Sequence, residues 1–245
     1  MEVFAACHLH SEWSYDAKCP LAALRSRFAD RGCRVLMMTE HDRGFTAARW
    51  QEYRRSCAQA STEDLLLIPG MEYSDAANRV HVLVWGPVPF LGEGLPTGEM
   101  LRQVKAANGV AVLAHPSRKN VWEIFEQGWS GALLGIEIWN RKYDGWAPSE
   151  RSRELLRGTS AVPFVGLDFH TERQLFPLAM ALNIEGTISE DQVLDCLRAR
   201  KCSARAFGSS LDHNLLRPAL PVFRVAERGR RAAARIAKKT GVFSR

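Results

Sequence analysis

Histidines recur where short apolar segments end. Four of these segments close on AACHLH, MMTEH, VLAH and VGLDFH, and each passes directly into a polar loop. In a closed barrel the carboxyl ends of the strands gather at one rim, whereas an open sheet would spread them along a line. The pattern therefore favours a barrel with a shared site at that rim. Six of the seven histidines stand at or beside strand ends: His8, His10, His41, His81, His115 and His170.

Strand and helix patterns alternate along the chain. The apolar segments are typical of a mainly parallel sheet buried on both faces. His81 begins its segment rather than ending it, so this strand is expected to run antiparallel to its neighbours. The alternation predicts an α/β fold, either a barrel or a doubly wound sheet. Strands are expected over residues 3–7, 35–39, 65–68, 81–85, 110–114, 133–138 and 162–167, and helices over 20–31, 45–59, 97–107 and 148–157.

Composition argues against a membrane protein. Of the 245 residues, 46% are hydrophobic and 24% are charged, which is ordinary for a soluble globular domain. No run of roughly 18 apolar residues is present, and the N-terminal segment lacks the basic and apolar stretches of a secretory signal. None of the six cysteines forms a C-x-x-C pair, so we expect free thiols in a reducing cytoplasm.

Carboxylates accompany the histidines. His8 and His10 are separated by one residue, as are Asp168 and His170, so each pair points to one face of a regular strand. Imidazole nitrogens and carboxylate oxygens are ligands of zinc, manganese and iron. Such ions, spaced about 3.5–4 Å apart, clamp a phosphate and activate water. The sequence therefore predicts a metal site, near which these carboxylates are expected: Asp16, Glu40, Asp42, Glu72 and Asp168.

Each of these residues also has a plainer interpretation. A single histidine at a strand end is more often a hydrogen-bonded polar residue than a ligand, but six histidines with two closely spaced pairs reverse that balance. Asp16 and Asp42 could be helix caps or surface charges. His213 is not at a strand end and is expected in a surface loop. Core or rim packing, rather than stacking on bases, is expected of the tryptophans, including Trp13, Trp85 and Trp139.

The ordered motifs resemble the PHP (polymerase and histidinol phosphatase) domain family of metal-dependent phosphoesterases. They read CHLHS with SYDA, TEHD, PGME, HVLVWG, AHP, GIEIWN and GLDFH, and they span residues 7–170 in the family's order. The resemblance implies a distorted (β/α)7 barrel over residues 1–211 with a site for up to three ions. Two differences from common family motifs, SYDA for SDG and TEHD for TDH, both fall at the third ion.

The resemblance also implies which residues hold each ion, expected to be zinc, manganese or iron. Nine residues are divided among three sites, and Glu72 bridges the first two. The first site takes His8, His10, Glu72 and Asp168, the second Glu72, His81 and His115, and the third Asp16, His41 and His170. Two or three divalent ions are therefore the expected cofactors.

The predicted function is hydrolysis of a phosphate ester by a metal-bound hydroxide. A water between two ions would lose its proton near neutral pH and attack phosphorus in line. Arg118, in HPSRK, resembles the arginine of the HPxR segment in nucleotide-cleaving members, and it is predicted to be catalytic together with Asp168. Arg43, Arg141 and Lys142 are weaker candidates for substrate contact than Arg118, and each could equally be a solvated surface charge.

The sequence leaves open which substrate is bound and whether the protein turns it over. A nucleotide, an oligonucleotide and a small phosphomonoester are all compatible with the motifs, and a histidinol-phosphatase-like enzyme is one alternative. A hydrolase acting on a carbonyl carbon is another, because a bridging hydroxide attacks that centre as well. A metal-binding regulatory module without turnover is a third. Glu40 is expected to orient a metal ligand by contact with that ligand and not with the ion.

Positive charge is concentrated at the C-terminus. Residues 224–245 hold eight basic side chains and one acid, a net charge of +7, so the +6 of the whole chain leaves −1 for residues 1–223. Alanines between the basic residues predict a helix within an extension over residues 212–245. Clustered lysine and arginine displace counterions from phosphate backbones. The extension is therefore either a handle for nucleic acid or a solvated terminal helix.

Overall fold

One of two six-stranded sheets is built around the N-terminal strand. The computed structural model describes residues 1–211 and 220–239. In this sheet the strand order is β12-β11-β10-β1-β2-β4, and β1 pairs in parallel with β2 and antiparallel with β10. The bounds are β1 Glu2–Leu9, β2 Val35–Met38, β4 Leu66–Ile68, β10 Leu178–Asn183, β11 Cys202–Ala206 and β12 Ser209–Ser210.

The second sheet has the order β3-β5-β6-β7-β8-β9. β6 is antiparallel to both of its neighbours, which confirms the direction expected for the strand that begins with His81. β7, β8 and β9 are parallel to one another. The bounds are β3 Glu40–His41, β5 Gly70–Ser74, β6 His81–Trp85, β7 Val110–Leu113, β8 Gly135–Asn140 and β9 Val162–Gly166.

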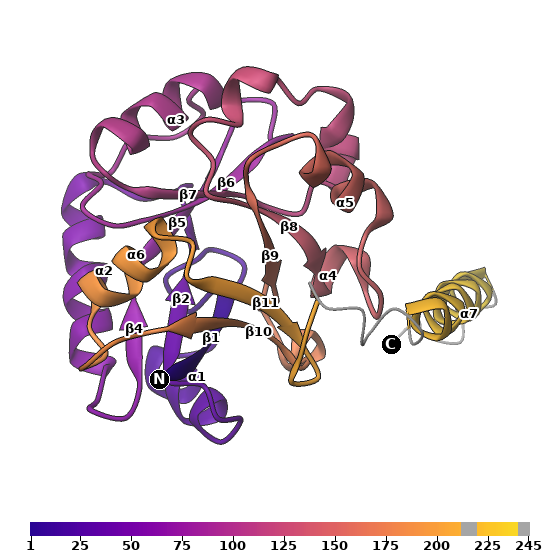
Figure 1. Ribbon diagram of the computed structural model, residues 1–245, viewed down its shortest axis with the longest axis horizontal. Coiled ribbons are helices and arrows are strands. Elements are labelled where there is room, and N and C mark those ends of the chain that lie inside the picture. Colours follow the sequence, from indigo (N-terminus) through magenta and orange to yellow (C-terminus); the bar gives the residue numbers. More distant parts are fainter. Residues whose placement is uncertain (212–219, 240–245) are drawn as a thin grey trace.

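The two sheets meet along the ends of β1 and β9. The backbone N–H of Phe169 donates to the carbonyl of His8, and the N–H of His10 donates to the carbonyl of Phe169, both over 3.0 Å. The strands curve around a common interior with helices outside them (Figure 1). The α/β class is confirmed. Over the described residues, however, the strands pair as two sheets, and a closed (β/α)7 barrel is not confirmed.

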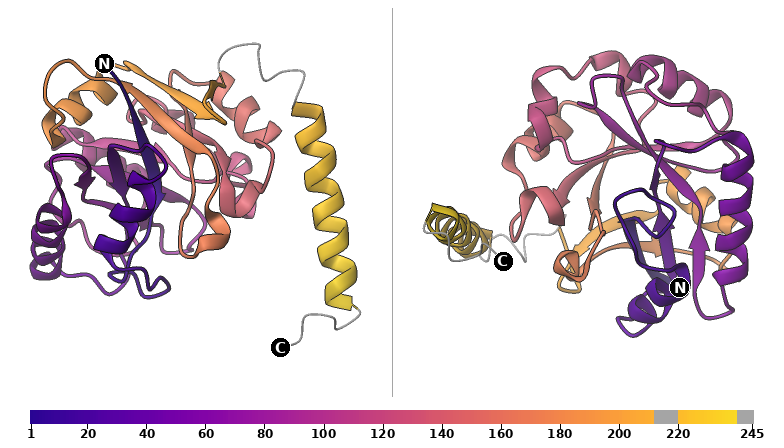
Figure 2. Two further views of the ribbon diagram at one scale, coloured as in Figure 1. Left: turned by 90° about the horizontal axis from the view of Figure 1, so that it is seen from below. Right: turned by 180° about the vertical axis from the view of Figure 1, so that it is seen from behind.

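The helices cover the outside of the sheets (Figures 1 and 2). The four helices expected from the sequence are present, with ends that differ from the prediction by up to two residues. Side-chain oxygens of Thr46, Ser149 and Ser189 cap three helices by accepting backbone N–H bonds. The α-helices are α1 Leu21–Ala29, α2 Ala47–Ala60, α3 Thr97–Ala106, α4 Arg141–Asp144, α5 Glu150–Arg157, α6 Glu190–Arg198 and α7 Leu220–Lys239, and short 3-10 helices span Arg118–Glu123, Gln127–Trp129 and Glu172–Gln174.

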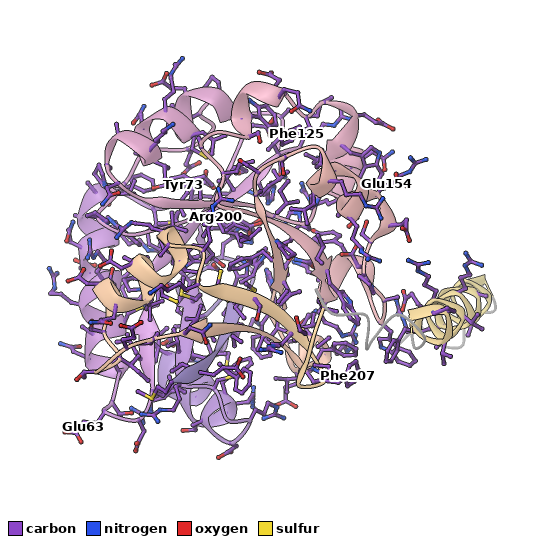
Figure 3. All side chains as sticks on the ribbon, viewed as in Figure 1. Glu63, Tyr73, Phe125, Glu154, Arg200 and Phe207 are labelled. Carbon is purple, nitrogen blue, oxygen red and sulfur yellow. The ribbon has the colours of Figure 1, made fainter. Side chains whose placement is uncertain are left out.

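Side chains fill the space between the sheets and the helices (Figure 3). Trp85 and Trp139 are completely buried, and their indole N–H groups donate to the carbonyls of Met38 and Gly145. Trp13 packs against the same core, so the expected packing role of these tryptophans is confirmed. All six cysteines are free, as expected. Among the described residues, no helix is both long enough and apolar enough to cross a bilayer.

Helix α7 stands to one side of the body, next to the α4 region (Figures 1 and 2). The Phe223 ring stacks on Phe207 at a centroid distance of 5.2 Å, and Glu227 accepts a hydrogen bond from the backbone N–H of Trp146. The helix expected in the extension is therefore present and contacts the body. His213 and the expected boundary at residue 211–212 fall on or beside residues 212–219, outside the described part, so the domain division stays a prediction.

Candidate metal centre

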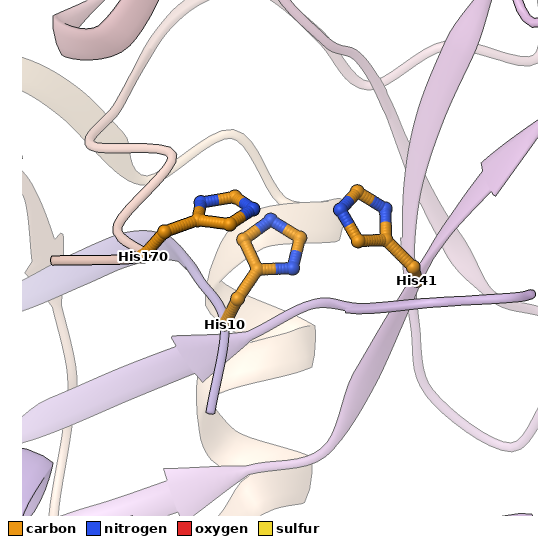
Figure 4. Close-up of side chains that lie close together, drawn as sticks. All are labelled: His10, His41 and His170. Atoms are coloured by element: carbon orange, nitrogen blue, oxygen red, sulfur yellow. The ribbon is translucent and has the colours of Figure 1, made fainter. Parts of the chain in front are cut away.

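Three histidines from distant parts of the chain face one another. His10 follows β1, His41 ends β3, and His170 lies four residues after β9. Their ring nitrogens point into one space (Figure 4). The ring of His10 lies 4.3 Å from that of His41 and 4.2 Å from that of His170, measured between centroids. Strand ends therefore converge here, as the sequence predicted.

Glu72 lies at the middle of the histidine cluster. This carboxylate is 1% exposed. Its Oε1 atom is 2.7 Å from His81 Nδ1 and 2.9 Å from His115 Nε2. Its Oε2 atom is 3.1 Å from His41 Nδ1 and 3.4 Å from His10 Nε2. One buried carboxylate thus faces histidines assigned to all three ions, which is the arrangement that a bridging ligand requires.

Asp168 and Asp16 complete the set of donors. Asp168 Oδ1 lies 3.2 Å from His170 Nδ1 and 3.9 Å from His8 Nε2. Asp16 Oδ2 lies 3.1 Å from His170 Nε2 and 3.4 Å from His41 Nε2. All nine residues predicted as metal ligands are therefore brought together. Three triads have ligand atoms within 4.8 Å of one another: His10, His41 and His170; His8, Glu72 and His115; and His8, His10 and Asp168.

Several buried atoms of this cluster make no hydrogen bond with the described residues. They are Nε2 of His8, His10 and His41, Nδ1 of His115, and Oε2 of Glu72. A buried polar atom without a partner costs free energy, so native structures nearly always satisfy it. Imidazole nitrogen and carboxylate oxygen are the donors that zinc, manganese and iron accept. The residues present therefore fit a site for divalent ions of this kind.

Three of the predicted ligands adopt left-handed backbone conformations. The φ angles are 62° at His8, 26° at His115 and 49° at Asp168. Such conformations cost about 1–3 kcal/mol each in residues other than glycine and cluster at functional sites. At His8 the register between β1 and β2 also shifts. His8 and His10 do face the same site, but a bulge directs them there and not the regular strand assumed from their spacing.

Glu137 forms hydrogen bonds with predicted metal ligands and so orients them. It was not predicted from the sequence. Its carboxylate is fully buried and accepts hydrogen bonds from His8 Nδ1 at 2.9 Å, from the His115 backbone N–H at 2.7 Å and from Asn140 Nδ2 at 2.9 Å. Gly166 makes room for it, because a Cβ there would lie 1.8 Å from Glu137 Oε1. A carboxylate inside the buried strand GIEIWN was the signal that could have identified it.

Glu40 performs a similar role for His10. Its Oε2 atom accepts a 2.5 Å hydrogen bond from Ser14 Oγ, which in turn lies 3.2 Å from His10 Nδ1. Its Oε1 atom accepts a 2.6 Å hydrogen bond from Ser11 Oγ. Burial raises the pKa of Glu40, while these hydrogen bonds oppose the rise. The contacts support the orienting role predicted for this residue.

The pKa values of the histidines in this cluster shift in opposite directions. Burial lowers the pKa of His41, but the negative charges of Glu72 and Asp16 outweigh it and raise that pKa to about 10. Burial also lowers the pKa of His170, but hydrogen bonds to Asp16 and Asp168 outweigh it and raise that pKa to about 9. Burial and the neighbouring His41 and His170 lower the pKa of His10. The site thus concentrates negative charge that attracts cations.

A polar cavity of about 330 Å³ opens onto the metal centre. Arg118 and Arg43 line it, as predicted for substrate contacts. Arg118 donates to the backbone carbonyl of Asn78 at 2.8 Å and to its side-chain oxygen at 2.9 Å. Lys142 also lines the cavity, and its Nζ lies 3.0 Å from Asp168 Oδ1. Two arginines and a lysine thus line the cavity together with four carboxylates, those of Asp16, Asp42, Asp75 and Glu93.

Arg141 is not brought to the cavity. Its guanidinium lies over the Phe176 ring, 5.0 Å from the centroid, and donates to the carbonyl of Arg173. The neighbouring Lys142 reaches the cavity instead, because helix α4 begins at Arg141 and successive side chains point about 100° apart around a helix. Arg141 and Lys142 were both candidates from the sequence, and Lys142 is the one that lines the cavity.

The fold and the donor set together define a class of site: a cluster of metal-binding residues at strand ends of an α/β protein. No family model and no curated protein matches the sequence. Solved structures do match in fold. A two-domain protein of Bacteroides vulgatus, which contains a predicted PHP-like metal-dependent phosphoesterase, aligns with a TM-score of 0.63 at 16% identity, over 84% of this chain and 65% of its own.

Two further structures have the same fold. PsfC of Pseudomonas syringae aligns with a TM-score of 0.63 at 14% identity, over 93% of this chain and 98% of its own. The lesion-specific endonuclease Q of Pyrococcus furiosus aligns with a TM-score of 0.59 at 13% identity, over 81% of this chain and 56% of its own. The chain thus spans less than two thirds of the Bacteroides and Pyrococcus proteins. The PHP-like fold predicted from the motifs is confirmed.

Proposed function

We propose that the protein is a metal-dependent phosphoesterase that hydrolyses a phosphate ester. The observation that carries this proposal is the convergence of nine nitrogen and oxygen donors beside a cavity lined by two arginines and a lysine. The donors suit cations, and the arginine and lysine side chains suit an anion that lies against those cations. A phosphate ester has the charge and the oxygen atoms that such a cavity accepts.

We also propose that the centre holds two or three ions of zinc, manganese or iron. When bound, such ions polarise phosphoryl oxygens and lower the pKa of a coordinated water. Glu72 would be the bridging ligand, since Oε1 faces His81 and His115 while Oε2 faces His10 and His41. The residues that would hold the ions are His8, His10, Asp16, His41, Glu72, His81, His115, Asp168 and His170.

The chain itself supplies orientation and positive charge. Glu137 keeps His8 in one orientation through its 2.9 Å hydrogen bond. Arg118 is held by Asn78, whose side-chain oxygen also lies 2.6 Å from His81 Nε2, so the guanidinium has a defined position near a metal ligand. Arg118 and Lys142 would neutralise the charge that builds on the phosphoryl oxygens during attack.

Phosphate release from a panel of esters tests the proposal. The purified protein, loaded with zinc, manganese or iron in turn, should hydrolyse at least one monoester or diester. His10→Ala and Asp168→Asn should abolish this activity with little change in the fold, because both residues hold ions. His213→Ala is the matched control, since His213 is the histidine outside the predicted ligand set. Full activity in Asp168→Asn would contradict the mechanism.

A nucleic acid is a second candidate substrate. Endonuclease Q, which is similar in fold, has been solved in complex with a 27-mer duplex substrate that has an abasic lesion at the active site. In this chain, Arg228 and Arg230 are exposed on α7, which carries most of the basic residues of the extension. Clustered positive charge on an exposed helix suits a phosphate backbone. We therefore propose that α7 contributes to binding of an oligonucleotide.

A further inference from the structure

An exposed tyrosine stands at the mouth of the cavity. Tyr15 is 63% exposed, although large aromatic side chains are usually highly buried. Its ring centroid lies 5.2 Å from that of the metal-site residue His41. The guanidinium of Arg43 lies over the Tyr15 ring, 5.2 Å from the centroid. Both side chains line the 330 Å³ cavity, so a flat aromatic surface and a flat cation stand together beside the metal centre.

The segment that carries Tyr15 is held on both sides. Ser14 Oγ donates to Glu40 and accepts a hydrogen bond from the backbone N–H of His41. On the other side, Asp16 contacts His41 and His170 at 3.4 and 3.1 Å. Two residues anchored to the metal centre therefore flank Tyr15, and the position of its backbone relative to that centre is set in advance.

Arg43 is carried by a segment that is held in the same way. The carboxylate of the preceding Asp42 accepts a 3.1 Å hydrogen bond from the backbone N–H of Ser74. The backbone N–H of the following Gly44 donates to Glu93 at 2.7 Å. Tyr15 and Arg43 are thus presented by two separately anchored segments, and their proximity does not depend on a single mobile loop.

We propose that Tyr15 and Arg43 form a subsite for the planar base of a nucleoside phosphate whose phosphate lies at the metal centre. The proposal rests on the proposed function and names the substrate class for it. Bare phosphate and aliphatic esters offer nothing that an aromatic face would recognise. A nucleobase stacks on tyrosine and on a guanidinium plane without regard to its sequence identity. Arg118 and Lys142, which line the same cavity, suit the attached phosphate.

Paired substrates and paired variants test the subsite. The ratio of kcat/KM for adenosine 5′-monophosphate to that for glycerol phosphate is measured in the wild type, Tyr15→Ala and Tyr15→Phe. Loss of one stacking ring should lower this ratio about 10-fold or more in Tyr15→Ala. Tyr15→Phe keeps the ring and should keep the ratio. An unchanged ratio in Tyr15→Ala, or an equal fall for both substrates, overturns the proposal, since an equal fall indicates a role at the metal centre.

Binding separates a failure of the subsite from a failure of the proposed function. Calorimetry with adenosine 5′-monophosphate and the metal-loaded protein measures affinity without any turnover. If the wild type hydrolyses no ester of the panel, the phosphoesterase proposal fails, and the affinities still decide the subsite. Affinity that falls about 10-fold or more in Tyr15→Ala and is retained in Tyr15→Phe supports the subsite. Equal affinity in the wild type and Tyr15→Ala overturns it.

Discussion

Alanine at Gly166 is expected to weaken metal binding, although Gly166 is not a ligand. The added Cβ would lie 1.8 Å from Glu137 Oε1 and 2.9 Å from the Cβ of His8. To reach even a 3.0 Å contact, the oxygen must retreat by about 1.2 Å, which disrupts its hydrogen bond from His8 Nδ1. Overpacking should cost about 1–3 kcal/mol of stability. Loss of the orienting carboxylate should lower metal affinity about 10- to 100-fold.

A second glycine supplies the control for this experiment. A Cβ at Gly109 would lie 2.4 Å from Val88 Cγ2 and 2.8 Å from Val104 Cγ1, so Gly109→Ala overpacks the core away from the metal ligands. Metal affinity is measured by competition with a chelator, on samples whose folding is checked by circular dichroism. Equal affinities in the two variants would refute the reasoning. If Gly166→Ala does not fold, Glu137→Gln decides, because it keeps the volume and removes the charge.

Four further predictions concern the cavity and the C-terminal helix. Arg118→Ala should lower turnover on the order of a hundredfold in steady-state assays, and unchanged turnover would remove its phosphate role. Lys142→Ala should lower kcat/KM more than Arg141→Ala, because only Lys142 lines the cavity; the reverse order would contradict its position. Glu227→Ala should leave the backbone N–H of Trp146 without its acceptor and lower the free energy of unfolding by about 1–3 kcal/mol. An unchanged midpoint of chemical denaturation would refute this. Replacing the four basic residues in 231–239 by alanine should weaken oligonucleotide binding and flatten its salt dependence while sparing small esters, and equal affinity at low salt would leave α7 without this role.

The residues at the centre of the site could be predicted because the signal is local. Each of the six histidines of the cluster stands in a strand or within four residues of a strand end, and strand ends gather wherever the strands pair. His81 shows the strength of this reasoning, since its place at the start of a segment predicted the reversed direction of β6. The chemistry of the site therefore follows from residue type and position along the chain.

Other features depend on contacts between distant residues. Strands β10 and β11 were missed because their stability comes from pairing with β1 and with each other, as in Val3 with Leu182. The left-handed backbone at His8 is imposed by the junction of the two sheets and has no local signature. Arg141 was predicted to contact the substrate but does not line the cavity, for a similar reason. A shift of one residue at the start of α4 decides which side chain reaches the cavity.

The number of ions bound per chain decides whether the metal centre is multinuclear. The nine donors exceed what one ion can use, since such ions commonly take four to six ligands, and Glu72 faces histidines on both sides. Elemental analysis of the protein, after gentle purification and again after reconstitution with excess zinc, manganese or iron, measures the number of ions per chain. We expect at least two equivalents in the wild type and fewer in Glu72→Gln. At most one equivalent after reconstitution would contradict a multinuclear centre.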